Sequence, residues 1–128
     1  MPETLLAHKL KLKPGSQAAI LNPPDGYLVE LAPERVTFDH TLSGLYDWIQ
    51  IFVHSQAELG DWQPALAAAL GPGGLLWISF PKAASKTQTD LTRDQGWEVL
   101  AALKRVTLVS LDANWSAFAF RHYHPGEA

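Results

Sequence analysis

The sequence predicts a single three-layer α/β domain over residues 1–128, with an open and mostly parallel sheet of about six strands. Short strand-like segments alternate with helix-like segments, which is the pattern of a parallel sheet covered by helices on both faces. The segment from Ala18 to Leu21 is wholly apolar, as expected for a strand that is buried on both faces. Hydrophobic residues make up 47% of the chain and charged residues 18%, so it has enough apolar side chains for a core.

The amino-terminal half is predicted to contain three strands. A turn at residues 13–16 leads into the strand at 18–21, which the sequence Asn-Pro-Pro-Asp-Gly at 22–26 ends. A short helix is expected over 27–31 and a second strand over 36–38, ending at Asp39. Residues 46–53 are predicted to form the strongest strand, because they are rich in aromatic and β-branched side chains.

A helical region follows this strand. Ser55 is the expected N-cap, and Glu58 completes a capping box with it. We expect Gly60-Asp61 to divide the region in two and Gly71 to end it as a C-terminal glycine.

The carboxyl-terminal half continues the alternation. A strand is predicted at 75–80, and a second capping box, Thr92 with Gln95, predicts a helix that begins near Thr92. A hairpin of strands at 106–111 and 115–120 closes the domain. Numbered along the chain, the strands are expected in the order 2-1-3-4-6-5, with the last strand antiparallel.

Composition argues against several classes of function. The chain has no cysteine, which excludes disulfides, thiolate zinc sites and cysteine nucleophiles. A net charge of −3 without a long run of like charge does not suggest a nucleic-acid partner. No apolar run reaches the roughly 18–20 residues of a membrane span, and the first residues lack a signal-peptide pattern, so a cytoplasmic location without a membrane partner is expected.

Two sets of segments resemble known families. The run from Leu70 to Ile78 (Leu-Gly-Pro-Gly-Gly-Leu-Leu-Trp-Ile) resembles the helix–turn–strand of class I S-adenosylmethionine-dependent methyltransferases, and Tyr46-Asp47-Trp48-Ile49 resembles the strand before it. The segments 79–82, 89–94, 96–98 and 115–117 are similar to a family of short bacterial proteins of unknown function with a Rossmann-like fold. The resemblance implies a truncated methyltransferase-like fold.

The chain also departs from the methyltransferase pattern. That pattern has a glycine-rich turn after the first strand, but here Pro23 and Pro24 remove two N–H donors and only Gly26 remains. Too few residues lie between the first strand and Tyr46 for two full β–α units, so one strand and one or two helices of the usual fold are expected to be missing. Asp39 stands where an acidic residue could hold ribose hydroxyls, but we interpret it as a strand-ending turn residue. We therefore expect no cofactor and no tight binding of S-adenosylmethionine.

A candidate ligand site is predicted at the edge where the parallel strands end, because crevices open there in doubly wound sheets. The polar segment from Lys82 to Arg93 lies at that edge and leads into the expected helix, whose N-terminus would favour an anion. The alternative is a solvated loop with helix caps. The candidate residues are Asn22, Asp25, Gly26, His54, Lys82, Lys86, Thr89, Asp90, Thr92 and Arg93.

Catalytic residues cannot be assigned from the sequence, and whether the chain is an enzyme stays open. His122 and His124 are too few for a metal site, and none is predicted. The main interpretation is a non-catalytic module that binds a partner protein or a small anionic ligand and has lost the S-adenosylmethionine site. The alternative is a small methyltransferase-like transferase with an adenosine-containing cofactor in an atypical pocket. A homodimer is possible, with Trp62, Trp97 and Trp115 as interface candidates, whereas Trp48 and Trp77 are expected in the core.

Overall fold

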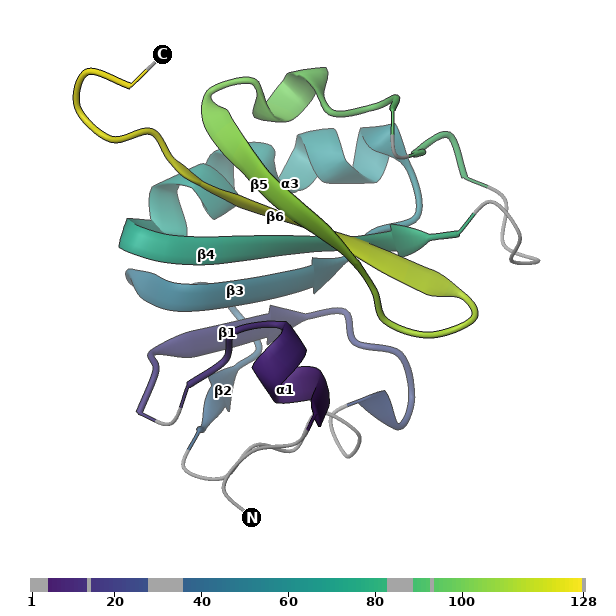
Figure 1. Ribbon diagram of the computed structural model, residues 1–128, viewed down its shortest axis with the longest axis horizontal. Coiled ribbons are helices and arrows are strands. Elements are labelled where there is room, and N and C mark those ends of the chain that lie inside the picture. The colour runs from purple at the N-terminus through teal and green to yellow at the C-terminus, as the bar shows by residue number, and fades with distance from the viewer. Residues whose placement is uncertain (1–4, 14, 28–35, 83–88, 93, 128) are drawn as a thin grey trace.

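In the computed structural model, which describes residues 5–13, 15–27, 36–82, 89–92 and 94–127, six strands form one sheet (Figure 1). The strand order β2-β1-β3-β4-β6-β5 confirms the prediction, and β6 is antiparallel to both of its neighbours. β1, β3 and β4 run parallel and end at one edge, called here the carboxyl edge; they begin at the amino edge. The strands are β1 (Ala18–Leu21), β2 (Phe38–Asp39), β3 (Tyr46–Phe52), β4 (Leu70–Pro81), β5 (Leu103–Ser110) and β6 (Trp115–His122).

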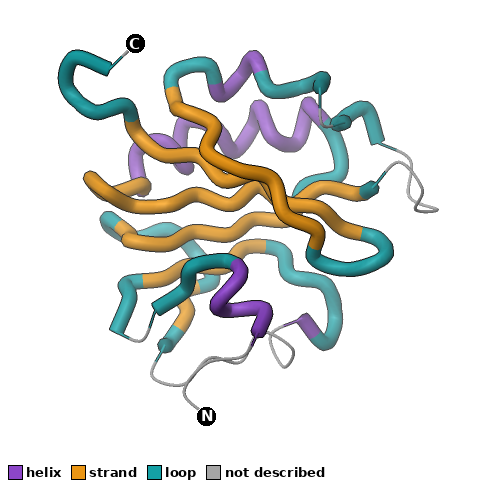
Figure 2. Tube along the Cα trace, viewed as in Figure 1, coloured by secondary structure: helices purple, strands orange, loops and turns teal. Residues whose placement is uncertain are grey.

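One face of the sheet packs against α3 (Gln56–Ala69) and the 3₁₀ turn η1 (Glu98–Leu100), as Figure 2 shows. Alternation along the strands sends Ile49 and Ile51 of β3, and Phe118 and Phe120 of β6, to this face. Trp97 joins them, and its ring meets Phe118 edge-on at 5.0 Å between centroids. β6 thus presents its phenylalanines to this face, and Ala117 and Ala119 to the other.

The opposite face packs against α1 (Leu5–Lys9) and the segment that follows it. The helix ends in a Schellman motif: the N–H of Leu12 reaches the carbonyl of Ala7, and Lys11 takes a left-handed φ of 59°. Within this turn the carbonyl of Leu10 accepts hydrogen bonds from the indoles of Trp48 and Trp77, each at 2.9 Å. Both indoles are buried, as predicted, and this shared acceptor fastens α1 to two central strands. The sequence prediction had assigned no helix here.

A row of buried, hydrogen-bonded side chains crosses the same face. The hydroxyl of Tyr27 donates to Oε1 of Gln50 at 2.9 Å, and the amide of Gln50 donates to Oγ of Ser79 at 2.9 Å. Gln50 and Ser79 are fully buried, so the bonds compensate for the lost contact with water. These hydrogen bonds link the segment after β1 to β3 and β4 and fix their relative positions.

The predicted division of the helical region at Gly60-Asp61 is wrong. Ser55 caps α3 as predicted, with its Oγ accepting the N–H of Glu58 at 3.1 Å, but the helix then runs unbroken to Ala69. Pro64 lies inside it and removes the N–H that would reach the carbonyl of Gly60. The buried side chains of Leu59 and Leu66 stand on either side of this defect, so packing on the sheet holds one continuous helix.

Gly71 does not act as the predicted C-terminal glycine. The helix ends at Ala69 with Leu70 in an extended conformation as its C-cap, and β4 starts at once. A Cβ atom on Gly71 would lie 3.0 Å from the carbonyl oxygen of Tyr46, and one on Gly74 would lie 2.8 Å from it. The glycines of this methyltransferase-like segment therefore allow β4 to pass close to the backbone of β3.

The helix predicted from Thr92 is also wrong. Oγ1 of Thr92 accepts the N–H groups of Asp94 and Gln95 as a cap would, at 3.3 and 3.1 Å. However, Gly96 then turns the chain with φ of 104°, and only the three-residue turn η1 follows. The left-handed glycine stops the helix before it starts.

Other boundaries differ by a few residues. β2 is Phe38–Asp39 rather than 36–38, and β5 starts at Leu103 rather than at 106. Most of the helix expected over 27–31 lies outside the described residues. No helix in the described part of the chain is long and apolar enough to cross a membrane.

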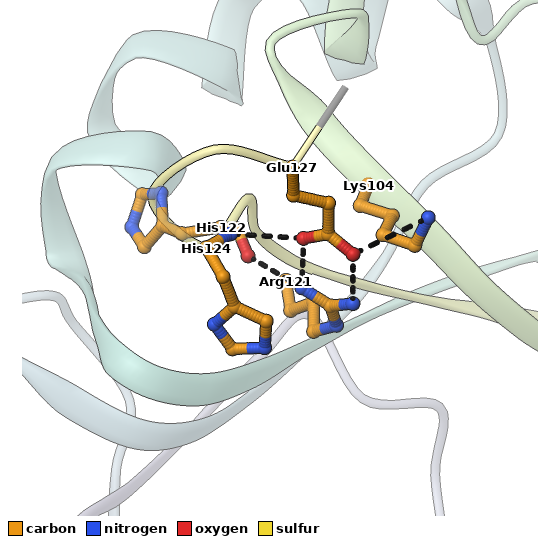
Figure 3. A network of polar contacts seen from close by, with 5 residues as sticks. All are labelled: Lys104, Arg121, His122, His124 and Glu127. Carbon is orange, nitrogen blue, oxygen red and sulfur yellow. Dashed lines mark hydrogen bonds and ion pairs between the residues drawn. The ribbon is translucent and has the colours of Figure 1, made fainter.

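The chain after β6 is fastened to the sheet by one carboxylate (Figure 3). Glu127 accepts two hydrogen bonds from the guanidinium of Arg121, each at 2.8 Å, and one from the backbone N–H of His124 at 2.9 Å. The ammonium of Lys104 on β5 lies 3.6 Å from the same carboxylate. The bidentate pair with Arg121 lowers the pKa of Glu127 strongly, and the bond from His124 lowers it further.

Candidate functional site

The turn after β1 forms the first part of the carboxyl edge. Asn22 and Gly26 both take left-handed backbone conformations, with φ of 57° and 81°. Asparagine tolerates this conformation better than most residues, and glycine adopts it freely. These two residues turn the chain around Pro23 and Pro24, and Asn22, Asp25 and Gly26 are exposed there.

His54 follows β3 at the same edge, and Glu58 orients it. The backbone N–H of His54 donates to Oε1 of Glu58 at 2.7 Å, and the Nδ1 atom of the ring lies 3.5 Å from the same oxygen. The ring meets Trp115 edge-on at 5.4 Å, yet 54% of the side chain is exposed. An imidazole that lies beside a carboxylate and is open to solvent is suited to accept or donate a proton.

Aromatic rings connect His54 to the segment after β1. Tyr27 meets Phe52 edge-on at 4.7 Å, and Phe52 meets Trp115 edge-on at 5.0 Å. Trp115, which begins β6, thus contacts both Phe52 and His54. This row of rings forms an apolar wall between the turn at 22–26 and the imidazole.

Asp39 has a structural partner. The hydroxyl of Tyr46 donates to Oδ2 of Asp39 at 2.6 Å, and the backbone N–H of Ser43 donates to the same hydroxyl at 3.0 Å. The bonds hold the short connection between β2 and β3. The arrangement agrees with the interpretation of Asp39 as a residue that ends a strand.

Among the predicted site residues after β4, Lys82 is engaged with the closing hairpin. Its ammonium donates to Oγ of Ser110 at 2.6 Å, and its backbone N–H donates to the carbonyl of Asn114 at 2.8 Å. Lys86 and Arg93 lie outside the described residues. Of the three cationic candidates in this segment, the structure therefore describes Lys82 alone.

Thr89, Asp90 and Thr92 stabilise local structure. Oγ1 of Thr89 accepts the N–H of Leu91 at 3.0 Å. Oδ1 of Asp90 accepts the N–H of Gln56 at 2.7 Å, so the start of α3 already holds an acceptor from the chain itself. Since no α-helix begins at Thr92, the helix-dipole argument for an anion at that point no longer applies.

The structure thus brings His54 and Asp90 together at the start of α3, one before the helix and one bonded to its first residue. Sequence reasoning used Glu58 only as a helix cap and missed it as the partner of His54. Their spacing of four residues was the available signal. Trp115 was considered only as an interface residue, and nothing in the sequence placed it beside Phe52.

The remaining predictions concern metals and partners. Nε2 of His122 lies 2.8 Å from the carbonyl oxygen of Leu70, and the described residues contain no group of three or more metal-ligand side chains. Of the three tryptophans proposed for an interface, Trp97 is 9% exposed and belongs to the core. Trp62 and Trp115 are partly buried. A homodimer stays a prediction.

Solved structures share this fold. The ribosomal protein L11 methylase of Lactobacillus delbrueckii subsp. bulgaricus is similar at a TM-score of 0.58 with 13% identity, over 94% of this chain and 76% of that one. The PH0226 protein of Pyrococcus horikoshii OT3 is similar at a TM-score of 0.57 with 11% identity, over 93% and 86%. A mutant of MtNAS in complex with S-adenosylmethionine is similar at a TM-score of 0.54 with 10% identity, over 91% of this chain and 59% of that one.

No family model matches the chain. No curated protein matches it either. At these identities the structural similarities establish the fold alone, and they confirm the predicted resemblance to class I methyltransferases. The closer likeness to a short bacterial family rests on the sequence segments that suggested it.

Proposed function

We propose that this chain is a small methyltransferase-like transferase that binds an adenosine-containing cofactor in an atypical site at the carboxyl edge. The observation that carries the proposal is the similarity of more than nine-tenths of the chain to the methylase and to a protein bound to S-adenosylmethionine. Ligands of doubly wound sheets bind where the winding reverses, which here is between β1 and β3. The turn at 22–26 and His54 flank that point.

The residues present do not fit S-adenosylmethionine in the usual manner. Asp39, the one acidic residue placed for ribose hydroxyls, is bonded to Tyr46. Pro23 and Pro24 have no N–H to offer to a cofactor beside β1. An adenosine-containing ligand would therefore be held at the carboxyl edge by different contacts, and no step of a reaction is assigned to it.

His54 is the residue proposed to handle a proton. The carboxylate of Glu58 lies 3.5 Å from Nδ1. In this proposal it orients the ring so that Nε2 faces an acceptor group. Nε2 would take the proton that an acceptor hydroxyl or amine loses on transfer. The exposed ring and its apolar neighbour Trp115 suit this role.

A second candidate is the non-catalytic binding module. It is favoured by the bond between Asp39 and Tyr46 and by the two prolines, both of which oppose the usual mode of cofactor binding. Such a module would keep the fold and use the carboxyl edge for a partner protein or a small anionic ligand.

Calorimetric titration with S-adenosylmethionine separates the two candidates. The transferase is expected to bind with a dissociation constant in the micromolar range. His54→Ala should weaken binding about three- to tenfold, because the imidazole flanks the proposed ligand position and the loss of one hydrogen bond to a ligand costs roughly 0.5–1.5 kcal/mol.

His124→Ala is the matched control, since it makes the same change in an exposed side chain at the other end of the parallel strands, where β6 ends beside the start of β4. It should leave the dissociation constant unchanged. The absence of heat and of thermal stabilisation at millimolar S-adenosylmethionine would refute the transferase and favour the module.

A further inference from the structure

A cavity of about 870 Å³ opens at the amino edge, the edge opposite the candidate site. Its walls come from parts of the chain that are distant in sequence: α1 and the turn after it, the start of β3 and the glycine-rich start of β4. A volume in this range is typical of sites for small molecules, which measure roughly 300–1,000 Å³.

The floor of the cavity is apolar. Leu12 and Trp48 are buried core residues whose atoms reach its wall, and Leu75 is partly buried beside them. Gly73 adds bare backbone, with a left-handed φ of 75° and open space where a Cβ would stand. The Schellman motif and the bonds from Trp48 and Trp77 to Leu10 hold this floor in place.

The rim carries positive charge. Lys11 and Lys13 are exposed on the lining, and neither ammonium has a hydrogen bond or an ion pair with the described residues. Asp47 is the carboxylate on the lining, and its Oδ2 accepts the backbone N–H of Gln17 at 3.1 Å. His8 also lines the cavity. The chain as a whole has a net charge of −3, so this cationic rim differs from the general charge of the molecule.

We propose that this cavity is a second binding site, which takes a small anion with an apolar body, such as an aromatic carboxylate. The body would lie on Leu75 and Gly73, above the buried side chains of Leu12 and Trp48, and the carboxylate would face the ammonium groups of Lys11 and Lys13. The two lysines supply charge without a fixed geometry. The site would therefore accept any small anionic group that is attached to an apolar body, rather than one particular head group. It lies at the edge opposite the proposed transferase site and does not depend on it.

The test is a titration of ¹⁵N-labelled protein with 2-naphthoate, followed by amide NMR. Saturable shifts are expected in the amides of residues 11–13, 47–48 and 73–75. The uncharged analogue 2-naphthalenemethanol has the same rings and should bind about tenfold more weakly, because each exposed ion pair contributes roughly a two- to fivefold gain in affinity.

The double variant Lys11→Gln/Lys13→Gln should bind 2-naphthoate about tenfold more weakly than the wild type, for the same reason. Its affinity for the alcohol should be unchanged. Lys104→Gln, which removes a charge on β5, is the control and should behave as the wild type. The proposal is overturned if 2-naphthoate causes no saturable shifts here, if the shifts fall instead on residues 22–26 and 54, or if the alcohol binds equally well. Shifts at 22–26 and 54 would support the carboxyl-edge site, so the two proposals can fail separately.

Discussion

Lys11 occupies a backbone conformation that suits glycine. It is the C′ residue of the motif that ends α1, and its φ of 59° brings Cβ close to the backbone. Lys11→Gly should therefore raise the free energy of unfolding by about 0.5–1 kcal/mol. The substitution relieves the backbone strain, and this gain exceeds the loss that comes from the greater entropy of glycine in the unfolded chain. Urea denaturation measures this change.

Lys13→Gly provides the control, because Lys13 does not have a left-handed φ. The same loss of a lysine side chain should there lower stability slightly or leave it unchanged. Equal effects of the two substitutions would show that the left-handed turn at Lys11 stores no strain.

Glu127 makes stability depend on pH. Its pKa is lowered in the folded protein, chiefly by Arg121, from an ordinary value of 4.5. As the pH falls below 4.5, the unfolded chain binds a proton at Glu127 before the folded chain does, so the stabilisation is present above this pH and is lost with acidification. Glu127→Gln should be less stable than the wild type at neutral pH, and the difference should shrink as the pH falls below 4.5.

Urea denaturation of both proteins at neutral pH and near pH 3 checks this expectation. The comparison with the variant removes the effect of the other carboxylates, which titrate in both proteins. A difference in stability that stays constant over this range would mean that the ion pair drawn in Figure 3 does not hold the chain end in solution.

At the scale of the elements, two glycines should respond in opposite ways to the same substitution. Gly60 lies inside α3, and a Cβ atom there would meet nothing within 4 Å. Gly60→Ala should stabilise the protein by about 0.5–1 kcal/mol through higher helix propensity.

Gly96 has φ of 104°, and its added Cβ would lie 2.5 Å from Cδ2 of Leu91. Gly96→Ala should destabilise the protein by more than about 1 kcal/mol. Melting temperatures measured under one condition compare the two variants. Similar effects of both would contradict the assignment of α3 as one helix and of Gly96 as the residue that stops the next.

The sequence predicted the strands better than the helices. Strands such as β3 are short, apolar and buried on both faces, and that composition is visible without tertiary information. The extent of α3 depends on packing that outweighs Gly60 and Pro64, and this packing appears in no local pattern. Conversely, the capping pattern at Thr92 exists, but Gly96 prevents the helix that such a pattern usually starts.

At the scale of the whole molecule, the strand order was predicted in full, and it is the order that the resemblance to class I methyltransferases and the closing hairpin imply. The candidate site was harder to predict from the sequence, because it depends on which side chains meet across the sheet. His54 was found because it directly follows a strand, but the contact with Trp115 joins positions 61 residues apart. The cavity at the amino edge is likewise built from segments whose proximity only the fold reveals.

We propose that this methyltransferase-like fold uses its carboxyl edge to bind an adenosine-containing ligand. The most direct test is a titration of ¹⁵N-labelled protein with S-adenosylhomocysteine, which resembles the cofactor but cannot transfer a methyl group. Saturable amide shifts are expected at Asn22, Asp25, Gly26 and His54, with the residues of the amino-edge cavity unaffected. Unchanged spectra at millimolar ligand, or shifts that avoid the carboxyl edge, would contradict it.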